Sequence, residues 1–364
     1  MGLGKSKTRH VGIELLRIIS MLMVTSLHVL GKGGFNISDV DSVSVFSTVV
    51  LTFSRVAVNC YILISGYFLS QKSFKLNRVT STYVQTWFYS ISTFLFLVLI
   101  HGVIFSKGLL LKSLFPFVFQ NYWFVTYYIL MLFIAPLLNS AFRDMSRTKH
   151  RLVLLVLIGF FVVYNTIVAP INPISDVDGF SLSLFLIIYC VAGYIRKYYS
   201  PDGKWYKYFS AYVIISLIIL ALHYLLKPLG SFYSNDILYG YKTILCFSAS
   251  VCLFLTFLNL NIKNKVLTKV VIFVAPLTFA VYLIHESLGF KVYLWEIINP
   301  KTVTATGPLF AIVSILIILA IFIVCIFVEY IRQLVFKLFK IDNLINVVSD
   351  IIEGKIRAFF SKGS

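Results

Sequence analysis

The most constraining feature of the sequence is an apolar run at residues 11–31 that contains three ionisable side chains, Glu14, Arg17 and His28. A run of 21 residues can cross a bilayer as a helix, and such charges inside it must face protein or water. At about 100° per residue, Arg17 and His28 project within about 20° of each other, and Glu14 lies about 60° from Arg17. Arg17 and His28 stand about 16 Å apart along the axis. The run therefore predicts a helix with one polar stripe, facing an interior site that is reached from both sides of the membrane.

The rest of the chain has the same membrane character, with 59% hydrophobic and 13% charged residues among 364. The sequence contains no alternating β-barrel pattern, so helices are expected to cross the bilayer. We predict an all-α polytopic bundle of about ten transmembrane helices, with a transmembrane domain at 1–335 and an amphipathic or flexible cytoplasmic tail at 336–364. The ten apolar runs lie at residues 11–31, 43–69, 80–105, 122–142, 152–170, 180–198, 208–226, 240–260, 267–288 and 308–330.

Basic residues predict the orientation. If the N-terminus is cytoplasmic, 23 of the 32 lysines and arginines fall on the cytoplasmic side and seven on the other side. This bias predicts cytoplasmic N- and C-termini. It also explains the net charge of +18 as a topology signal and an attraction to anionic membrane lipids, so no nucleic-acid partner is expected. The first run has no cleavage pattern after His28, and we expect it to be retained.

Arg55 falls near the centre of the second predicted helix, with Asn59 on the same face. A charge at this depth costs about 2.5–3.5 kcal/mol on insertion scales, so Arg55 must face protein or water. A functional role is favoured, and a structural ion pair with a carboxylate such as Glu14 is the alternative. Further along the same helix, Ser65 and Gly66 favour the close approach of another backbone.

Several polar or aromatic residues sit at the predicted outer ends of helices. Trp123 opens the fourth helix, where an aromatic belt is the simpler explanation and ligand stacking the functional one. Four histidines (His28, His101, His223 and His285) fall near the outer face, and Glu286 follows the last of them; Asp176, Asp178 and Asp236 could meet sugar hydroxyls there. The five cysteines form no C-x-x-C pair, so neither a disulfide nor a metal site is predicted.

These residue types permit two kinds of chemistry. An imidazole can abstract a hydroxyl proton or carry an acyl group, and arginine can hold a phosphate or carboxylate with two hydrogen bonds. The motifs of the common soluble enzymes, such as G-x-S-x-G, H-E-x-x-H and the P-loop, are missing from the sequence. From the residues alone, the chain is an enzyme or a transporter with a polar path through a helix bundle.

Four motifs in order resemble the membrane-bound acyltransferase-3 family over essentially the whole chain. They are E-x-x-R-x10-H at Glu14, Arg17 and His28, SRVAVNCYILISGYFL from Ser54, YWFVTYYILMLFIAPLL from Tyr122 and YLIH from Tyr282. Short members of this family resemble bacterial surface-polysaccharide O-acetyltransferases. The resemblance implies a protein of the bacterial plasma membrane that takes acetyl-CoA from the cytoplasm as its acyl donor. The acceptor it implies is a hydroxyl of a polysaccharide or lipid-linked glycan.

The resemblance also implies roles for individual residues. His28 would be the catalytic base or a transient acyl carrier, and Arg17 would position it or the donor. Arg55 would contact the pantetheine or phosphate part of the donor, while Tyr282 and His285 would line the acceptor end. The full expectation is a catalytic set of His28, Glu14 and Arg17, a substrate-binding set of Arg55, Asn59, Ser65, Trp123, Tyr282 and His285, and no metal.

Two other function classes stay open. A lipid-linked glycan flippase or small-solute transporter could use Arg17, Arg55 and His28 as a polar path, although the repeated halves typical of transporters are not evident in the sequence. A structural factor for cell-surface synthesis would tolerate the loss of all three charges. Whether the chain forms a homo-oligomer is not determined by the sequence.

Overall fold

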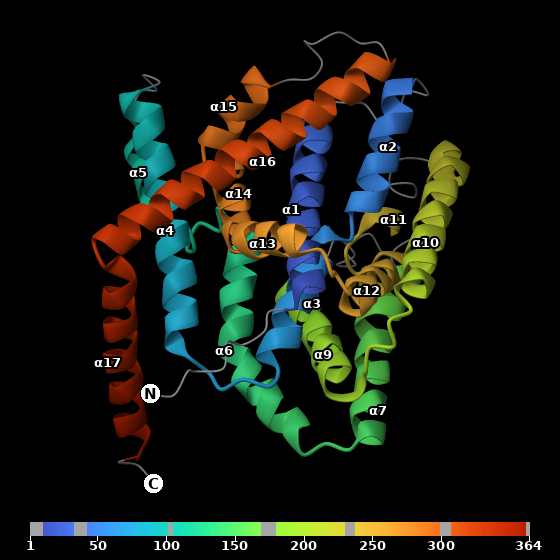
Figure 1. The fold of residues 1–364 in the computed structure, drawn as a ribbon, viewed down its shortest axis with the longest axis horizontal. Helices are drawn as coiled ribbons and strands as arrows, with labels where there is room; N and C mark the ends of the chain where they lie inside the picture. Colours follow the sequence, from blue (N-terminus) through green and yellow to red (C-terminus); the bar gives the residue numbers. More distant parts are fainter. Residues whose placement is uncertain are drawn as a thin grey trace.

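The computed structural model describes residues 10–32, 42–100, 105–168, 180–229, 237–298 and 307–361. Every regular element within these ranges is helical (Figure 1), which confirms the all-α class. The α-helices are α1 Val11–Lys32, α2 Ser42–Ser54, α3 Ala57–Leu69, α4 Leu76–Leu99, α5 Lys107–Leu114, α6 Trp123–Arg143, α7 Arg147–Ile158, α8 Tyr164–Val168, α9 Leu182–Tyr198, α10 Trp205–Leu226, α11 Ile237–Tyr239, α12 Ile244–Asn259, α13 Lys265–Val274, α14 Thr278–His285, α15 Phe290–Ile297, α16 Gly307–Leu338 and α17 Ile341–Ser361, with a π-helical segment at Gly159–Val163 and 3-10 turns at Lys227–Leu229 and Ala275–Leu277.

Eight helical segments in the described ranges are long and apolar enough to cross a membrane, so the chain is a multi-pass membrane protein. They correspond to eight of the ten predicted runs. The runs at 180–198 and 240–260 form shorter helices, α9 with 17 residues and α12 with 16. The start of α12 is delayed to Ile244 because the Thr243 hydroxyl accepts a hydrogen bond from the Cys246 N–H and caps the helix there.

Helix α1 lies in the middle of the bundle. It packs against α2, α3, α12, α13, α14 and α16, which surround it in Figure 1. Its polar residues therefore face protein on several sides, as the cost of exposing a charge to lipid requires. Glu14 is buried, and Arg17 and His28 are half-buried.

Two of the predicted helices are interrupted. The run at 43–69 breaks into α2 and α3 at Arg55 and Val56, and the run at 267–288 breaks at the 3-10 turn Ala275–Leu277. Pro276 lies in that turn and has no N–H to continue an α-helix. Both breaks lie next to α1, where protein groups can satisfy the freed backbone. The interruptions turn Arg55 and the end of α14 toward one region of the interior.

The C-terminal helix α17 packs along α4 at the edge of the bundle (Figure 1). Asn77 Nδ2 donates to Asn346 Oδ1 at 2.9 Å, and Ser349 Oγ donates to Thr80 Oγ1 at 3.0 Å. Apolar side chains of α17 stay exposed on its other faces, in agreement with the amphipathic pattern of the tail. The cytoplasmic placement of both termini remains a prediction, and His101, Asp176, Asp178 and Asp236 lie outside the described residues.

Gly66 provides the close approach that the sequence predicted, between α3 and α9. A Cβ added at Gly66 would lie 2.8 Å from the Ala192 Cβ and 3.1 Å from the Tyr189 Cα. Because backbone atoms cannot move aside cheaply, we expect Gly66→Ala to destabilise the protein by about 1–3 kcal/mol. A lowered melting temperature in detergent would measure this. Gly159→Ala is the matched control, since a Cβ there meets no atom within 4 Å; equal melting temperatures of the two variants would contradict the packing argument.

A buried polar cluster that the sequence analysis did not predict joins α16 to α4. Glu329 is fully buried and accepts hydrogen bonds from Tyr89 Oη at 2.6 Å, Arg332 Nη2 at 2.7 Å and Gln333 Nε2 at 2.9 Å. We expect Glu329→Ala to cost about 3–5 kcal/mol, because it leaves the Arg332 charge buried without a partner. Thermal unfolding of the purified protein measures the loss. The double variant Glu329→Leu with Arg332→Met removes both charges and should restore most of the stability; no recovery would show that the ion pair is not the cause.

Candidate active site

Four of the predicted site residues meet at one cavity of about 410 Å³. His28 comes from α1, Arg55 from the break between α2 and α3, Trp123 from the start of α6 and Tyr282 from α14. The remaining lining is mostly apolar and aromatic, with Glu286 and Lys291 as its other charged side chains. An apolar cavity with a few convergent polar groups is the usual form of a ligand site.

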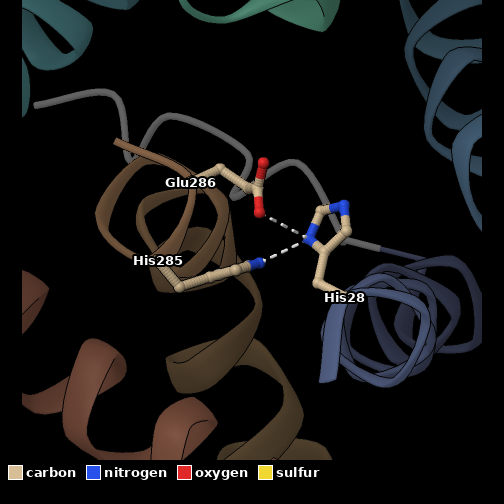
Figure 2. A group of neighbouring side chains, drawn as sticks. All are labelled: His28, His285 and Glu286. Carbon is tan, nitrogen blue, oxygen red and sulfur yellow. Dashed lines mark hydrogen bonds and ion pairs between the residues drawn. The ribbon is translucent and has the colours of Figure 1, made fainter. Parts of the chain in front are cut away.

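The chemically distinctive group at this cavity consists of His28, His285 and Glu286 (Figure 2). His28 and Glu286 line the cavity, whereas His285, predicted to line its acceptor end, is not part of the lining. His28 Nδ1 lies 2.7 Å from His285 Nε2 and 3.5 Å from Glu286 Oε1. His285 is fully buried, whereas the His28 side chain keeps about a fifth of its surface exposed, at 21%. Two neighbouring side chains at the end of α14, His285 and the C-cap residue Glu286, therefore contact the same nitrogen of His28.

The contacts between the two rings and with Val281 define one consistent pair of tautomers. His285 Nδ1 contacts the Val281 carbonyl oxygen, which can only accept, so Nδ1 carries the hydrogen. In a neutral ring, His285 Nε2 is then an acceptor, and His28 Nδ1 must donate to it. In that tautomer the lone pair of His28 is on Nε2, which points away from His285 and Glu286 in Figure 2. His28 is thus oriented as a base whose conjugate acid would be stabilised by the Glu286 carboxylate.

The local sequence explains why the two histidines meet. Helix α14 ends at His285, and Glu286 follows as its C-cap residue, so the two side chains leave the helix at its end. Val281 lies one turn earlier, which brings its carbonyl under the His285 ring. Helix α1 packs against α14, and His28 lies on it at the level of the C-terminal end of α14.

The same three residues offer ligand atoms that all lie within 4.8 Å of one another, a spacing that could hold a metal ion. The two histidine nitrogens, however, stand at a hydrogen-bond distance of 2.7 Å. Two nitrogens bound to tetrahedral zinc at 2.0–2.1 Å would be about 3.3 Å apart. The observed geometry therefore favours a proton held between the rings.

Glu14 and Arg17 pair with each other and do not line this cavity. Arg17 Nη1 lies 2.6 Å from Glu14 Oε2, so the carboxylate suggested as a partner for Arg55 is held by Arg17 instead. Tyr61 does line the cavity, and its hydroxyl lies 3.2 Å from the Arg17 carbonyl oxygen. Arg17 is not part of the lining of the cavity that contains His28, and Tyr61 links the two through its contact with the Arg17 backbone.

The last two predicted residues are on α3 behind the cavity wall. Asn59 is fully buried, and its Nδ2 donates to the Tyr241 carbonyl at 3.0 Å, which fixes a residue that lines the cavity. Ser65 is half-buried one turn beyond Tyr61 and is not part of the lining. Of these two, Asn59 contributes to the site indirectly.

Sequence reasoning missed the residues that surround Arg55. The guanidinium carbon lies 5.3 Å from the centroid of the Tyr241 ring, and that ring stacks with Trp123 at a centroid distance of 6.2 Å. Lys291, on α15, also lines the cavity. The only signal in the sequence was the aromatic pair in Tyr239-Gly240-Tyr241, which is weak in a chain with 22 tyrosines.

Comparison with known proteins adds one finding. The sequence model of a family described as "Acyltransferase domain", acyltransferase 3, matches residues 10–330. No curated protein and no solved structure matches the chain. The match covers every residue of the cavity and of the histidine pair.

Proposed function

Because this chain belongs to the acyltransferase-3 family, we propose that it transfers an acetyl group from acetyl-CoA to a hydroxyl of a cell-surface polysaccharide or lipid-linked glycan. The observation that supports this most directly is the oriented imidazole of His28 at the wall of a cavity inside a membrane bundle. A base held in one tautomer, next to a carboxylate, suits the activation of a weakly acidic sugar hydroxyl.

The hydrogen-bond geometry supports the following reaction. His28 Nε2 takes the proton of the acceptor hydroxyl as its oxygen attacks the thioester carbonyl carbon. The tetrahedral intermediate collapses, the carbon–sulfur bond breaks, and the leaving thiolate takes the proton from His28 Nε2. The products are an acetyl ester and free coenzyme A. During the step in which His28 is an imidazolium, His285 Nε2 and Glu286 Oε1 both face the Nδ1–H and stabilise the charge.

Other residues of the cavity suit a sugar. Trp123 and Tyr282 present aromatic rings to the cavity, on which the apolar face of a pyranose can pack. Asn59 keeps Tyr241 in place by donating to the Tyr241 carbonyl.

Glu14 and Arg17 lie behind Tyr61, toward the side predicted to be cytoplasmic, and we assign this pair to positioning the donor as it approaches.

The test uses purified full-length protein in lipid nanodiscs with acetyl-CoA and with glycans extracted from cells that lack the protein. We expect release of the coenzyme A thiol together with a glycan that gains the mass of an acetyl group. A glycan flippase reconstituted in lipid vesicles would instead move lipid-linked glycan across the vesicle membrane without consuming acetyl-CoA. Glycan movement with the donor left intact would overturn the proposal in favour of transport.

A further inference from the structure

Arg55 is a cavity residue whose charge is left largely uncompensated by the part of the chain that the structure describes. Its Nε donates to the Tyr239 carbonyl at 2.7 Å, and its guanidinium packs over the rings of Tyr239 and Tyr241. Within the described ranges, the two terminal nitrogens have no protein acceptor and no carboxylate partner. Four N–H donors are therefore available to a ligand in the cavity.

The position of Arg55 makes this arrangement costly unless a ligand uses it. Arg55 interrupts the membrane segment Val45–Leu69 near its middle, at the break before α3. An arginine at such a depth normally faces a partner, a substrate path or water. The start of α3 next to it adds partial positive charge from the helix dipole. At this point the cavity wall is therefore positively charged and favours an anionic group of a ligand.

The charged side chains of the cavity lining are mostly cationic. Its charged side chains are Arg55, Lys291 and Glu286, and the carboxylate of Glu286 already faces His28. Lys291 has no ion-pair partner in the described part of the chain. A ligand in the cavity therefore meets two cationic side chains, Arg55 and Lys291, and one carboxylate, Glu286, which already faces His28.

We propose that the acceptor sugar carries an anionic group, a carboxylate or a phosphate, and that Arg55 binds it with its two terminal nitrogens while His28 faces the reacting hydroxyl. The proposal rests on the proposed function and concerns which acceptor the site selects. The donor fits Arg55 less well, because the pantetheine arm separates the thioester from the nearest phosphate, whereas Arg55 and His28 line the same cavity of about 410 Å³. The planar guanidinium fits two oxygens of either anion.

Isothermal titration of the full-length protein in nanodiscs tests this without any need for turnover. The probes are D-glucuronate, its neutral methyl ester and glucose 1-phosphate. We expect at least one of the two anions to bind at least about tenfold more tightly than the ester, the difference that one charge-assisted contact supplies. A preference for glucuronate alone indicates an acidic sugar, and a preference for glucose 1-phosphate alone indicates a sugar phosphate.

The variant Arg55→Gln should abolish this preference, and Arg55→Lys should keep part of it as a point charge. Arg151→Gln, at an exposed arginine of α7 outside the cavity, is the matched control and should bind as the wild type does. Equal or absent binding of anions and ester overturns the proposal. So does an Arg55→Gln variant that keeps the preference but raises the KM for acetyl-CoA, since Arg55 would then serve the donor. Failure of the proposed function is a separate result, in which anions bind but no acetyl-CoA is consumed.

Discussion

Replacing His28 with asparagine should reduce acetyl transfer by about 10³-fold while leaving the protein folded, because the substitution removes the base and keeps its anchor. The asparagine amide can still donate to His285 Nε2, where His28 Nδ1 donates at 2.7 Å in the native protein. It has no atom equivalent to the basic Nε2. Thiol release from acetyl-CoA in the presence of the glycan acceptor measures the loss in kcat.

The control for this variant is a second histidine that lies outside the cavity. His223, on α10, is buried against the rings of Tyr224 and Tyr239, and it is not among the lining residues. We expect His223→Asn to retain activity within about threefold at temperatures where it stays folded. If His28→Asn retained wild-type turnover with an unchanged melting temperature, His28 would not be the base.

Replacing His285 with phenylalanine should lower kcat by about 10²-fold through the loss of positioning. The ring shape is kept, but His28 Nδ1 loses the acceptor that fixes its tautomer. His28 Nδ1 then keeps only the Glu286 oxygen at 3.5 Å as an acceptor, so the orientation of the ring and its tautomer are held less firmly. Because His285 binds no substrate in this mechanism, the KM for acetyl-CoA should change little.

A double variant separates positioning from a general structural effect. If His285 acts through His28, adding His285→Phe to His28→Asn should cost almost nothing further, since residues that act as a unit are not additive. Glu286→Gln should give a smaller loss of about tenfold, because its oxygen stands at 3.5 Å and only stabilises the imidazolium charge. Fully additive losses in the double variant would mean that His285 works independently of His28.

Much of the architecture could be predicted from composition and periodicity. Each apolar run long enough to cross a bilayer became helical, since lipid offers no partner to an unpaired backbone group. Where the prediction differed, local features of the chain decided the boundary. Thr243 shortened α12, and Arg55 marks a break inside a run that looked continuous.

The site was predicted in part. His28 and Arg55 stand out as ionisable residues inside apolar runs, Trp123 as an aromatic residue at a helix end, and Tyr282 through the family resemblance; the structure brings all four to one cavity. Glu14 and Arg17 were selected because they share a helical stripe with His28. They pair with each other behind Tyr61, because a stripe on one helix does not say which neighbour covers each part of it.

The sequence by itself determined that this chain is a helical membrane protein and which few residues are too polar to face lipid, because bilayer thickness and backbone hydrogen bonding act on each segment separately. Only the tertiary structure decided that His285 and Glu286 meet His28, and that the Glu14 carboxylate suggested for Arg55 pairs with Arg17 instead. Partners 257 residues apart are set by how α14 packs on α1, and packing depends on the shapes of all the helices together.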